Sequence, residues 1–444
     1  MSKRLIRLLA LLSVLAVVAA ACGDGGAEDT TTSVADTTPT TEAEAPTTTE
    51  AEAPTTTAAE EETPAGDFEP VPMKIGTLLP QTGQLSAIID ALLLPIDINV
   101  EEINEAYPGL VTVEHFDSGT DPAVASENVD QILTGDFNGM IGAAASGVST
   151  AIVDKVQTAE MAMCSGSNTG ASLTQYDPYY IRTAPTDELQ APTLGDLMIN
   201  DGITNAAVIW RNDEYGVGFG EALADYLEGS GVTVSVRQGY DPQQSSFSAL
   251  IDEIANAGAE GLAMITFEEG GQIVLDMQGR FDGTVYVADG FVDTVGAEQL
   301  GGEENVALLE GFRGTYPSVA PENGEPTFPD RFAEFAPDAP TVFSAHKYDC
   351  LMVLVLAAQA AGSATPADYI DAVIDVTGPP GEKCSLFADC MALLEAGEEI
   401  DYDGASGPLD FNEHGQPSAG TYDLFEFDAE GNNVTFDQVL IEAP

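Results

Sequence analysis

Short apolar runs alternate with longer stretches of helical periodicity along the chain from Met73 onward. The first run spans residues 73–79, ends at Pro80, and precedes a helical pattern over residues 85–107. Buried strands that alternate with helices are typical of a parallel sheet with helices on both faces. The pattern therefore predicts an α/β fold. It places further strands at residues 111–116, 139–145, 161–164, 206–210, 232–236, 261–266 and 285–288, and further helices at 121–133, 149–159, 218–228 and 247–257.

The part of the chain after Met73 is too long for one ordinary hydrophobic core, so we expect two lobes. Changes of composition near residues 182–192 and 314–317 indicate crossings between the lobes. Residues 345–361 are rich in Ala, Leu and Val on all sides, which predicts a buried helix. Residues 403–436 are expected to form short strands joined by turns.

The first 72 residues differ in composition from the rest. Basic residues, an apolar run over residues 8–18 and small residues follow one another before Cys22, and this order predicts a secretory signal peptide over residues 1–21. The apolar run is too short to span a bilayer. The small residues and Cys22 resemble a bacterial lipobox, so we expect Cys22 to carry a lipid anchor. Residues 22–72 are rich in Thr, Glu, Ala and Pro and are expected to form a disordered stalk.

Acidic residues far outnumber basic ones, with 74 Asp and Glu against 13 Lys and Arg. The resulting net charge of −61 argues against nucleic acid as a partner, because a polyanion would be repelled. A heavily solvated surface explains this charge better than an acidic binding function does.

Four cysteines remain besides Cys22. An even number in an exported protein indicates two disulfides, for which three connectivities exist. The short spacing of Cys384 and Cys390 favours a local pair, which leaves Cys164 to pair with Cys350. Metal ligation is the rival interpretation. The histidines show no ligand spacing to the cysteines, and we predict no metal site.

Two of the apolar runs are followed by small hydroxyl residues and glycines. Ser146 and Ser149 follow the first of these runs, and Ser167 and Thr169 follow the second. The carboxyl ends of neighbouring parallel strands meet at one edge of a sheet, beside a helix N-terminus, where open α/β sheets bind ligands. The residues therefore predict a cradle for an anion. Helix capping and turn formation are the alternative roles for them.

Motifs for catalysis are missing from the sequence. It contains no nucleophile elbow, phosphate-binding loop, zinc-binding His pair or dinucleotide fingerprint. Its 3 histidines are scattered, which gives acid–base catalysis by histidine little support. We interpret Glu268 and Glu269 as part of a solvated loop rather than as a hydrolytic pair. We therefore predict a protein that is not an enzyme, with no catalytic residues and no cofactor.

Five motifs occur along the chain in a characteristic order. Together they resemble the type I periplasmic binding proteins of the leucine/isoleucine/valine and branched-chain amide branch, which are the substrate-capturing lipoproteins of ABC importers. The resemblance covers nearly everything after the stalk. The motifs are 75–83 (Ile-Gly-Thr-Leu-Leu-Pro, then Thr-Gly), the loops at Ser146 and Thr169, 180–185 (Tyr-Ile-Arg-Thr-Ala-Pro), 212–216 (Asn-Asp-Glu-Tyr-Gly) and 347–349 (Lys-Tyr-Asp).

The resemblance implies two Rossmann-like lobes with parallel sheets, joined by a hinge of three crossings, which close on a small ligand. Lobe 1 then comprises residues 73–183 and 316–418, and lobe 2 comprises residues 184–315 and 419–444. On the side of lobe 1, Ser146, Ser167 and Thr169 would hold a ligand carboxylate together with backbone N–H groups.

Three residues of lobe 2 would contact the ligand from the other side. By position in the resemblance, Tyr215 packs on the ligand, Phe267 closes the pocket and Asp289 receives the α-amino group. Their alternative roles are a covered helix end for Tyr215, a place in the core for Phe267 and a turn with Gly290 for Asp289. Donors at one end and an acid at the other suit a zwitterion better than a sugar.

The implied function is that of an extracytoplasmic lipoprotein, anchored to the cell membrane and facing outward. It would deliver an amino acid, branched-chain or similar, to an ABC permease. We expect a monomer that touches the membrane only through its lipid. Two alternatives stay open: a sensor subunit that reports to a membrane kinase, and a ligand that is an amide, urea or an aromatic acid.

Overall fold

The computed structural model describes residues 68–318 and 327–442. The predicted signal peptide, the predicted lipidation site Cys22 and residues 22–67 of the predicted stalk lie outside the described residues. Within the described ranges, no helix combines the length and the apolar character that crossing a bilayer requires.

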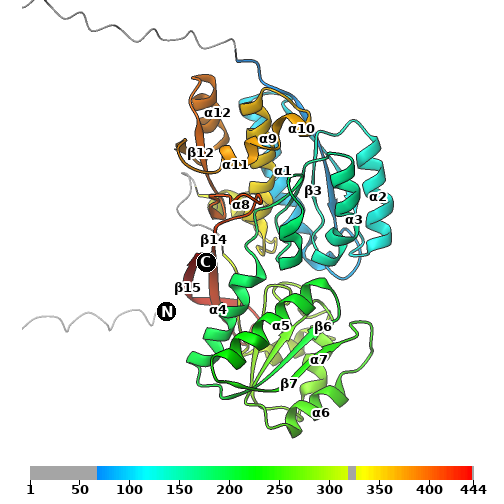
Figure 1. Cartoon of the computed structure of the whole chain (residues 1–444). Helices are drawn as coiled ribbons and strands as arrows, with labels where there is room; N and C mark the ends of the chain where they lie inside the picture. Colours follow the sequence, from blue (N-terminus) through cyan, green and yellow to red (C-terminus); the bar gives the residue numbers. More distant parts are fainter. Residues whose placement is uncertain (1–67, 319–326, 443–444) are drawn as a thin grey trace, which may run out of the picture. The chain divides into compact units, whose positions relative to one another are not determined.

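Five parallel strands form the first sheet, in the spatial order β2-β1-β3-β4-β5. Helices α1 and α9 pack against each other on one face, and α2 and α3 pack against each other on the opposite face (Figure 1). Cover on both faces explains why most of these strands are continuous apolar runs. The bounds are β1 Met73–Leu79, β2 Val111–Asp117, β3 Gly139–Gly142, β4 Met163–Ser165, β5 Tyr180–Arg182, α1 Ile89–Ala106, α2 Pro122–Thr134, α3 Ser146–Thr158 and α9 Ser344–Ala361.

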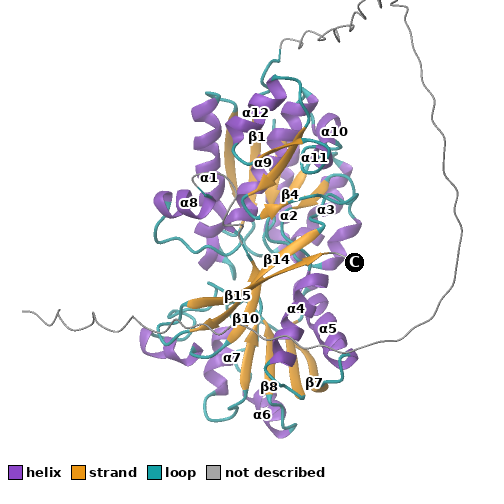
Figure 2. Ribbon diagram, turned by 90° about the vertical axis from the view of Figure 1, so that its left-hand side faces the viewer, coloured by secondary structure: helices purple, strands orange, loops and turns teal. Residues whose placement is uncertain are grey.

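The second sheet has seven strands in the order β15-β14-β10-β9-β8-β6-β7. Strands β6 to β10 run parallel, whereas β14 and β15 add an antiparallel hairpin at one edge (Figure 2). The bounds are β6 Asn205–Arg211, β7 Thr233–Tyr240, β8 Gly261–Ile265, β9 Thr284–Val287, β10 Arg313–Pro317, β14 Ala419–Phe427, β15 Asn433–Glu442, α4 Asp187–Asn200, α5 Glu214–Gly229, α6 Ser248–Asn256 and α7 Gly270–Met277.

The predicted α/β fold with parallel sheets is confirmed, and some boundaries differ. β3 ends at Gly142 and α3 begins at Ser146, so the strand is shorter and the helix longer than predicted. The strand ends at a position that requires glycine, because φ is +142° there and a Cβ would lie 2.3 Å from the carbonyl oxygen of Leu78. Residues 314–317, expected to be a crossing, belong to β10, which pairs with β14. The lobe boundary predicted between residues 315 and 316 therefore falls inside a strand.

Several smaller elements complete the fold. A three-stranded sheet, β11-β12-β13, lies beside α9 and α12. Their bounds are β11 Glu382–Cys384, β12 Ile400–Gly404, β13 Gly407–Pro408, α8 Phe328–Phe335, α10 Pro366–Tyr369, α11 Ala372–Asp375 and α12 Phe387–Glu395, with 3-10 turns at η1 Ser86–Ile88, η2 Ala171–Gln175 and η3 Glu303–Leu309.

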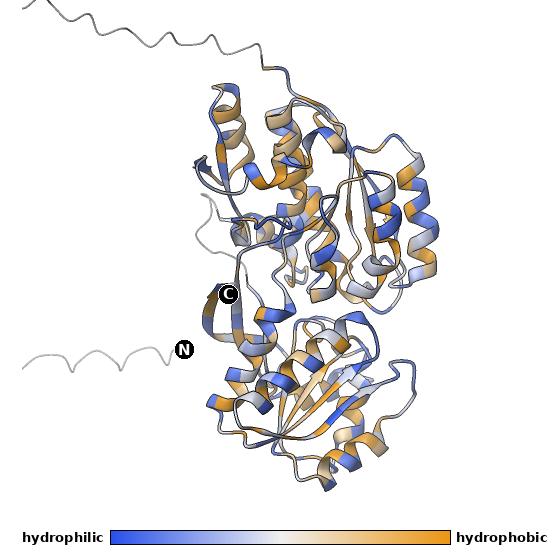
Figure 3. Ribbon diagram, viewed as in Figure 1, coloured by the Kyte–Doolittle hydropathy of each residue, from blue (hydrophilic) through white to orange (hydrophobic). Residues whose placement is uncertain are grey.

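Helix α9 is buried over residues 344–359, as predicted from its richness in Ala, Leu and Val. Figure 3 shows the contrast with α2 and α3, whose polar and apolar residues alternate. The buried carboxylate of Asp349 accepts hydrogen bonds from Tyr402 Oη at 2.6 Å and from the backbone N–H of Ala405 at 2.8 Å. These bonds tie the small sheet to α9, because a buried carboxylate is costly unless it is satisfied.

Both predicted disulfides are present. Cys164 of β4 is joined to Cys350 of α9, and Cys384 is joined to Cys390 of α12. The first bond links residues 186 positions apart and the second links residues 6 positions apart. A disulfide that closes a longer loop restricts the unfolded chain more.

We expect the two disulfides to differ in their contribution to stability. Replacing Cys164 and Cys350 by Ser should lower the free energy of unfolding by about 5 kcal/mol in the chain-entropy model, against about 2 kcal/mol for Cys384 and Cys390. Urea unfolding of both double variants measures the difference. A larger loss from the short loop would contradict the expectation.

Candidate functional site

All six side chains predicted to bind a ligand line one small cavity. The cavity lies at the carboxyl ends of strands from both sheets, where parallel α/β sheets bind ligands. Its volume of about 20 Å³ has room for about one water molecule, so a larger ligand enters only when the walls move apart. The lining consists of Ser146, Ser167, Thr169, Tyr215, Phe267 and Asp289, together with Leu85, Ile88, Ala144, Ala145, Gly290, Thr294 and Phe343.

Hydroxyl residues form the wall on the side of the first sheet. Ser146 is the first residue of α3, and its Oγ accepts a hydrogen bond from the N–H of Gly170 at 3.2 Å. Ser167 Oγ donates to the carbonyl oxygen of Ala144 at 3.1 Å, which fixes the position of its lone pairs. Thr169 is buried and lines the same cavity. The N-terminus of α3 and the hydroxyls of Ser146 and Thr169 together favour an anionic group.

Ser149, which the sequence placed on the same rim, has a different role. Its Oγ accepts a hydrogen bond from the N–H of Ala143 at 3.1 Å, beneath the loop that joins β3 to α3. It is fully buried and does not line the cavity. The earlier start of α3 explains the change, since it moves Ser149 one turn into the helix.

A buried arginine supports the loop that carries Thr169. The Nη1 of Arg182 donates to the carbonyl oxygens of Gly170 at 2.8 Å and Asn168 at 3.2 Å. Its Nη2 donates to Oε1 of Gln416 at 2.7 Å, and Gln416 lies at the last crossing between the lobes. Arg182 lies within one of the five sequence motifs, but its contacts become visible only in the folded chain.

Aromatic residues and a carboxylate form the opposite wall. Tyr215 and Phe267 stack with their ring centroids 5.4 Å apart and an interplanar angle of 12°. Tyr215 Oη donates a hydrogen bond to Oδ1 of Asp289 at 3.2 Å and accepts one from the N–H of Gly290 at 3.3 Å. Tyr215 is thereby fixed between an aromatic face and a carboxylate.

The carboxyl of Asp289 is buried, and burial raises its pKa to about 7, although hydrogen bonds from Tyr215 and Gln190 oppose the rise. A second carboxyl, that of Asp187, is buried nearby at the start of α4. Burial, and then repulsion from Asp289, raises the pKa of Asp187 well above its usual value. Neither Oδ atom of Asp187 accepts a hydrogen bond with standard geometry from the residues that the structure describes.

Asp187 is a candidate site residue that the sequence did not reveal. An acidic residue in the first turn of a helix is ordinarily explained by the helix dipole. The signal that could have identified it is that Thr186, Asp187 and Glu188 open a helix directly after a crossing between the lobes. A hydrogen bond from Thr169 and the guanidinium of Arg182 lower the pKa of Asp187 but do not offset its burial, so the two carboxyls favour a cationic group beside them.

Glu269, interpreted from sequence as part of a solvated loop, is in fact buried. Its carboxylate accepts hydrogen bonds from Nη1 of Arg211 at 3.1 and 3.0 Å, and Tyr240 Oη donates to it at 3.0 Å. The ion pair compensates the desolvation of Glu269. Glu268, by contrast, is partly exposed.

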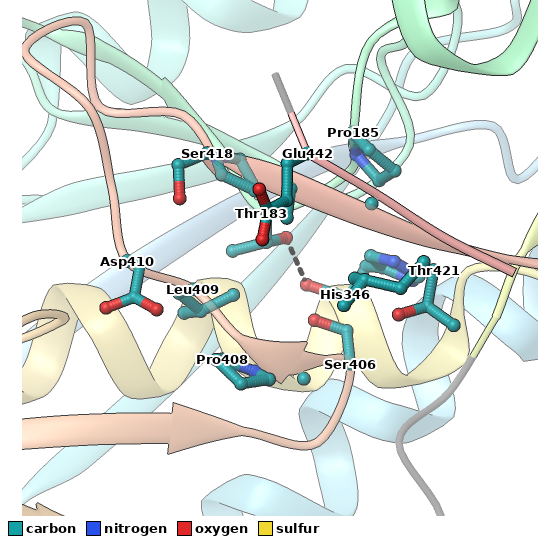
Figure 4. Close-up of a pocket in the computed structure, with 15 residues that line it drawn as sticks. Thr183, Pro185, His346, Ser406, Pro408, Leu409, Asp410, Ser418, Thr421 and Glu442 are labelled. Atoms are coloured by element: carbon teal, nitrogen blue, oxygen red, sulfur yellow. Dashed lines mark hydrogen bonds between the residues drawn. The ribbon is translucent and has the colours of Figure 1, made fainter. Parts of the chain in front are cut away.

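A larger cavity of about 450 Å³ lies where the chain crosses between the lobes (Figure 4). Thr183, Pro185, Ser418 and Glu442 are among its lining residues, and none of the six predicted ligand-binding residues lines it. Its walls also include His346 of α9, Gly407 and Pro408 of β13, and Leu440 of β15. The smaller cavity, which combines buried charges with fixed donors, is therefore the candidate site. Among the described residues, no group of three or more His, Cys, Asp or Glu side chains is arranged to hold a metal ion.

A family model described as periplasmic binding protein matches residues 72–432. One curated relative is the chemotactic signal transduction system substrate-binding protein BasB of Halobacterium salinarum. It is 24% identical over 375 residues, which cover 79% of this chain and 86% of the relative.

Solved structures share the fold over most of the described chain. A leucine binding protein LivK from Thermotoga maritima superposes with a TM-score of 0.70 at 20% identity, covering 83% of this chain and 99% of its own. The branched-chain amino acid transporter substrate binding protein LivJ from Streptococcus pneumoniae, in complex with isoleucine, has a TM-score of 0.68 at 17% identity and covers 84% and 99%.

Proposed function

The chain belongs to the periplasmic binding protein family, and on this premise we propose that it captures an α-amino acid, branched-chain or of similar size, in the small cavity between its lobes. The observation that carries the proposal is a cavity with buried hydroxyl residues on one wall and the buried carboxyl of Asp289 on the other, with the buried carboxyl of Asp187 near enough to be repelled by it. An α-amino acid carries the two complementary charges.

The proposed orientation follows from the chemistry of the two walls. The ligand carboxylate accepts hydrogen bonds from Ser146, Thr169 and nearby backbone N–H groups, while its ammonium lies against Asp289 and Asp187. Charge-assisted hydrogen bonds of this kind are stronger than neutral ones. The ligand side chain is left to the apolar part of the lining, which consists of Leu85, Ile88, Phe267 and Phe343.

Titration calorimetry with three probes of one carbon skeleton tests this orientation. L-Leucine carries both charged ends, 4-methylpentanoate lacks the ammonium, and 3-methylbutylamine lacks the carboxylate. We expect only L-leucine, or another amino acid of similar size tested in the same way, to bind measurably. Binding of the deaminated acid as tightly as the amino acid would mean that the ligand is an aromatic or aliphatic acid, and the proposal would be wrong.

We propose further that the protein is a lipoprotein of an ABC importer, held on the outer side of the membrane through Cys22. A sensor role is the second candidate, and the relative BasB favours it, because that protein is named as part of a chemotactic signal transduction system. Deleting the gene and measuring uptake of the radiolabelled ligand distinguishes them: an importer subunit is required for uptake, and a sensor subunit is not.

Replacing Cys22 by Ser tests the anchor. Two or more acyl chains hold a protein stably on a membrane, whereas none remains on the variant. We therefore expect Cys22→Ser to be released into the medium or to keep its signal peptide, as seen by fractionation and immunoblotting. Retention of a processed variant in the membrane fraction would show that the anchor lies elsewhere.

A further inference from the structure

Arg211, the last residue of β6, is almost completely buried beside the ligand cavity. Its side chain is 4% exposed, and its Nε pairs with Oδ2 of Asp213 at 2.6 Å. Its Nη1 pairs with Glu269, as described above. Its Nη2 donates a hydrogen bond to Oε1 of Gln84 at 2.9 Å. Gln84 follows β1 of the first sheet, so this one bond joins the two lobes.

On its own lobe, Arg211 supports the aromatic wall of the cavity. The guanidinium carbon lies 3.7 Å from the ring centroid of Phe267, and Phe267 in turn stacks on Tyr215. A planar guanidinium packs well on an aromatic face. Any movement of Arg211 relative to Gln84 therefore moves a wall of the cavity.

On the other lobe, Gln84 belongs to a loop of fixed shape. Thr82 donates to Asp117 through its Oγ1 at 2.6 Å and its N–H at 3.1 Å. Gly83 has a φ of +89°, and a Cβ there would lie 1.9 Å from the carbonyl oxygen of Gly119. Leu85, the next residue after Gln84, lines the cavity. Gln84 and the wall residue Leu85 thus move together.

We propose that the hydrogen bond between Arg211 and Gln84 is a latch between the lobes, which holds Leu85 and Phe267 in place around a bound ligand. The proposal rests on the proposed function of the cavity. Arg211 already forms ion pairs with two carboxylates, those of Asp213 and Glu269. Its guanidinium is therefore held in this position and does not bind a ligand anion. The neutral amide of Gln84 adds a directional contact without burying another charge.

A bond that exists only when the lobes are in contact stabilises that arrangement and slows its opening. Loss of this bond should mainly increase the dissociation rate of the ligand, because affinity differences between related complexes lie mostly in their dissociation rates. Gln84 and Arg211 act as positioning residues, through the neighbours that line the cavity.

The test compares Gln84→Ala with Gln84→Glu and with Gln81→Ala, a change at an exposed residue of the same loop. Stopped-flow measurement gives the dissociation rate of L-leucine. Pulsed electron paramagnetic resonance gives the distance between spin labels at Glu127→Cys and Glu253→Cys, exposed positions on the two lobes, with no ligand added.

We expect Gln84→Ala to speed dissociation roughly three- to tenfold and to shift the label distances to longer values. Gln81→Ala should behave like the parent. Gln84→Glu keeps an acceptor for Arg211 but adds a charge beside Asp213 and Glu269, so it should speed dissociation less than Gln84→Ala does. Unchanged distances and an unchanged rate in Gln84→Ala would overturn the latch. If L-leucine fails to bind the parent, the proposed ligand is wrong, and the distance measurement alone then decides on the latch.

Discussion

Asp289→Ala is expected to weaken amino-acid binding roughly thirtyfold to several thousandfold, which corresponds to about 2 to 5 kcal/mol. The substitution leaves the ligand ammonium in a desolvated site with Asp187 as its only remaining carboxylate partner in our proposed orientation. Tyr215 also loses its acceptor. Titration calorimetry measures the change in Kd.

Ser146→Ala is the matched comparison on the opposite wall. It removes one neutral donor to a charged group and should cost only about 1.5 to 3 kcal/mol. If Asp289→Ala binds as tightly as the parent, then Asp289 serves only the turn with Gly290, or the ligand carries no amino group. An equal loss in both variants would contradict the proposed difference between the two ends of the ligand.

The affinity for an amino acid is expected to fall as the pH is lowered below about 7. Burial raises the pKa of Asp289 to about 7, so in acid the ligand ammonium has to displace a proton. If binding releases one proton from Asp289, the affinity drops about tenfold between pH 8 and pH 6, and about tenfold more between pH 6 and pH 5. The amino acid itself stays zwitterionic over this range. Calorimetry across the pH range measures the slope.

Ser146→Ala provides the control for this slope, because it removes no titrating group and should shift the whole curve without changing its shape. Asp289→Asn should flatten the curve, since only Asp187 is left to titrate. A parent protein whose affinity is constant from pH 5 to pH 8 would show that Asp289 keeps its charge without the ligand.

The same raised pKa predicts that Asp289 makes the ligand-free protein more stable as the pH is lowered, whereas the affinity for the ligand falls. The folded state binds a proton more tightly than the unfolded state, in which the pKa of Asp289 is near its usual value. The contribution of Asp289 to the free energy of unfolding therefore falls as the pH rises from about 4 to about 7 and is constant above that. Asp289→Asn should be more stable than the parent at pH 8, by roughly 2 to 4 kcal/mol. A variant that is more stable but binds more weakly has lost binding without losing its fold.

The sequence by itself determined the fold class and the position of the candidate site. Alternation of apolar runs and helical stretches is a local property, and in a parallel sheet it brings the ends of separate strands to one edge. Ser146 and Thr169 each follow such a run, which is why they were predicted together. The family resemblance added Asp289, and all three residues line one cavity. Cysteine spacing likewise indicated both disulfides.

The tertiary structure alone decided which polar groups are buried and what they face. Asp187 has the local sequence of an ordinary helix start, and Glu269 that of a solvated loop, because burial depends on the packing of distant segments. The contact of Arg211 with Gln84 joins residues 127 positions apart, and no local pattern encodes it. The charges that set the pH dependence, and the bond between the lobes, therefore arise only when the two sheets are brought together.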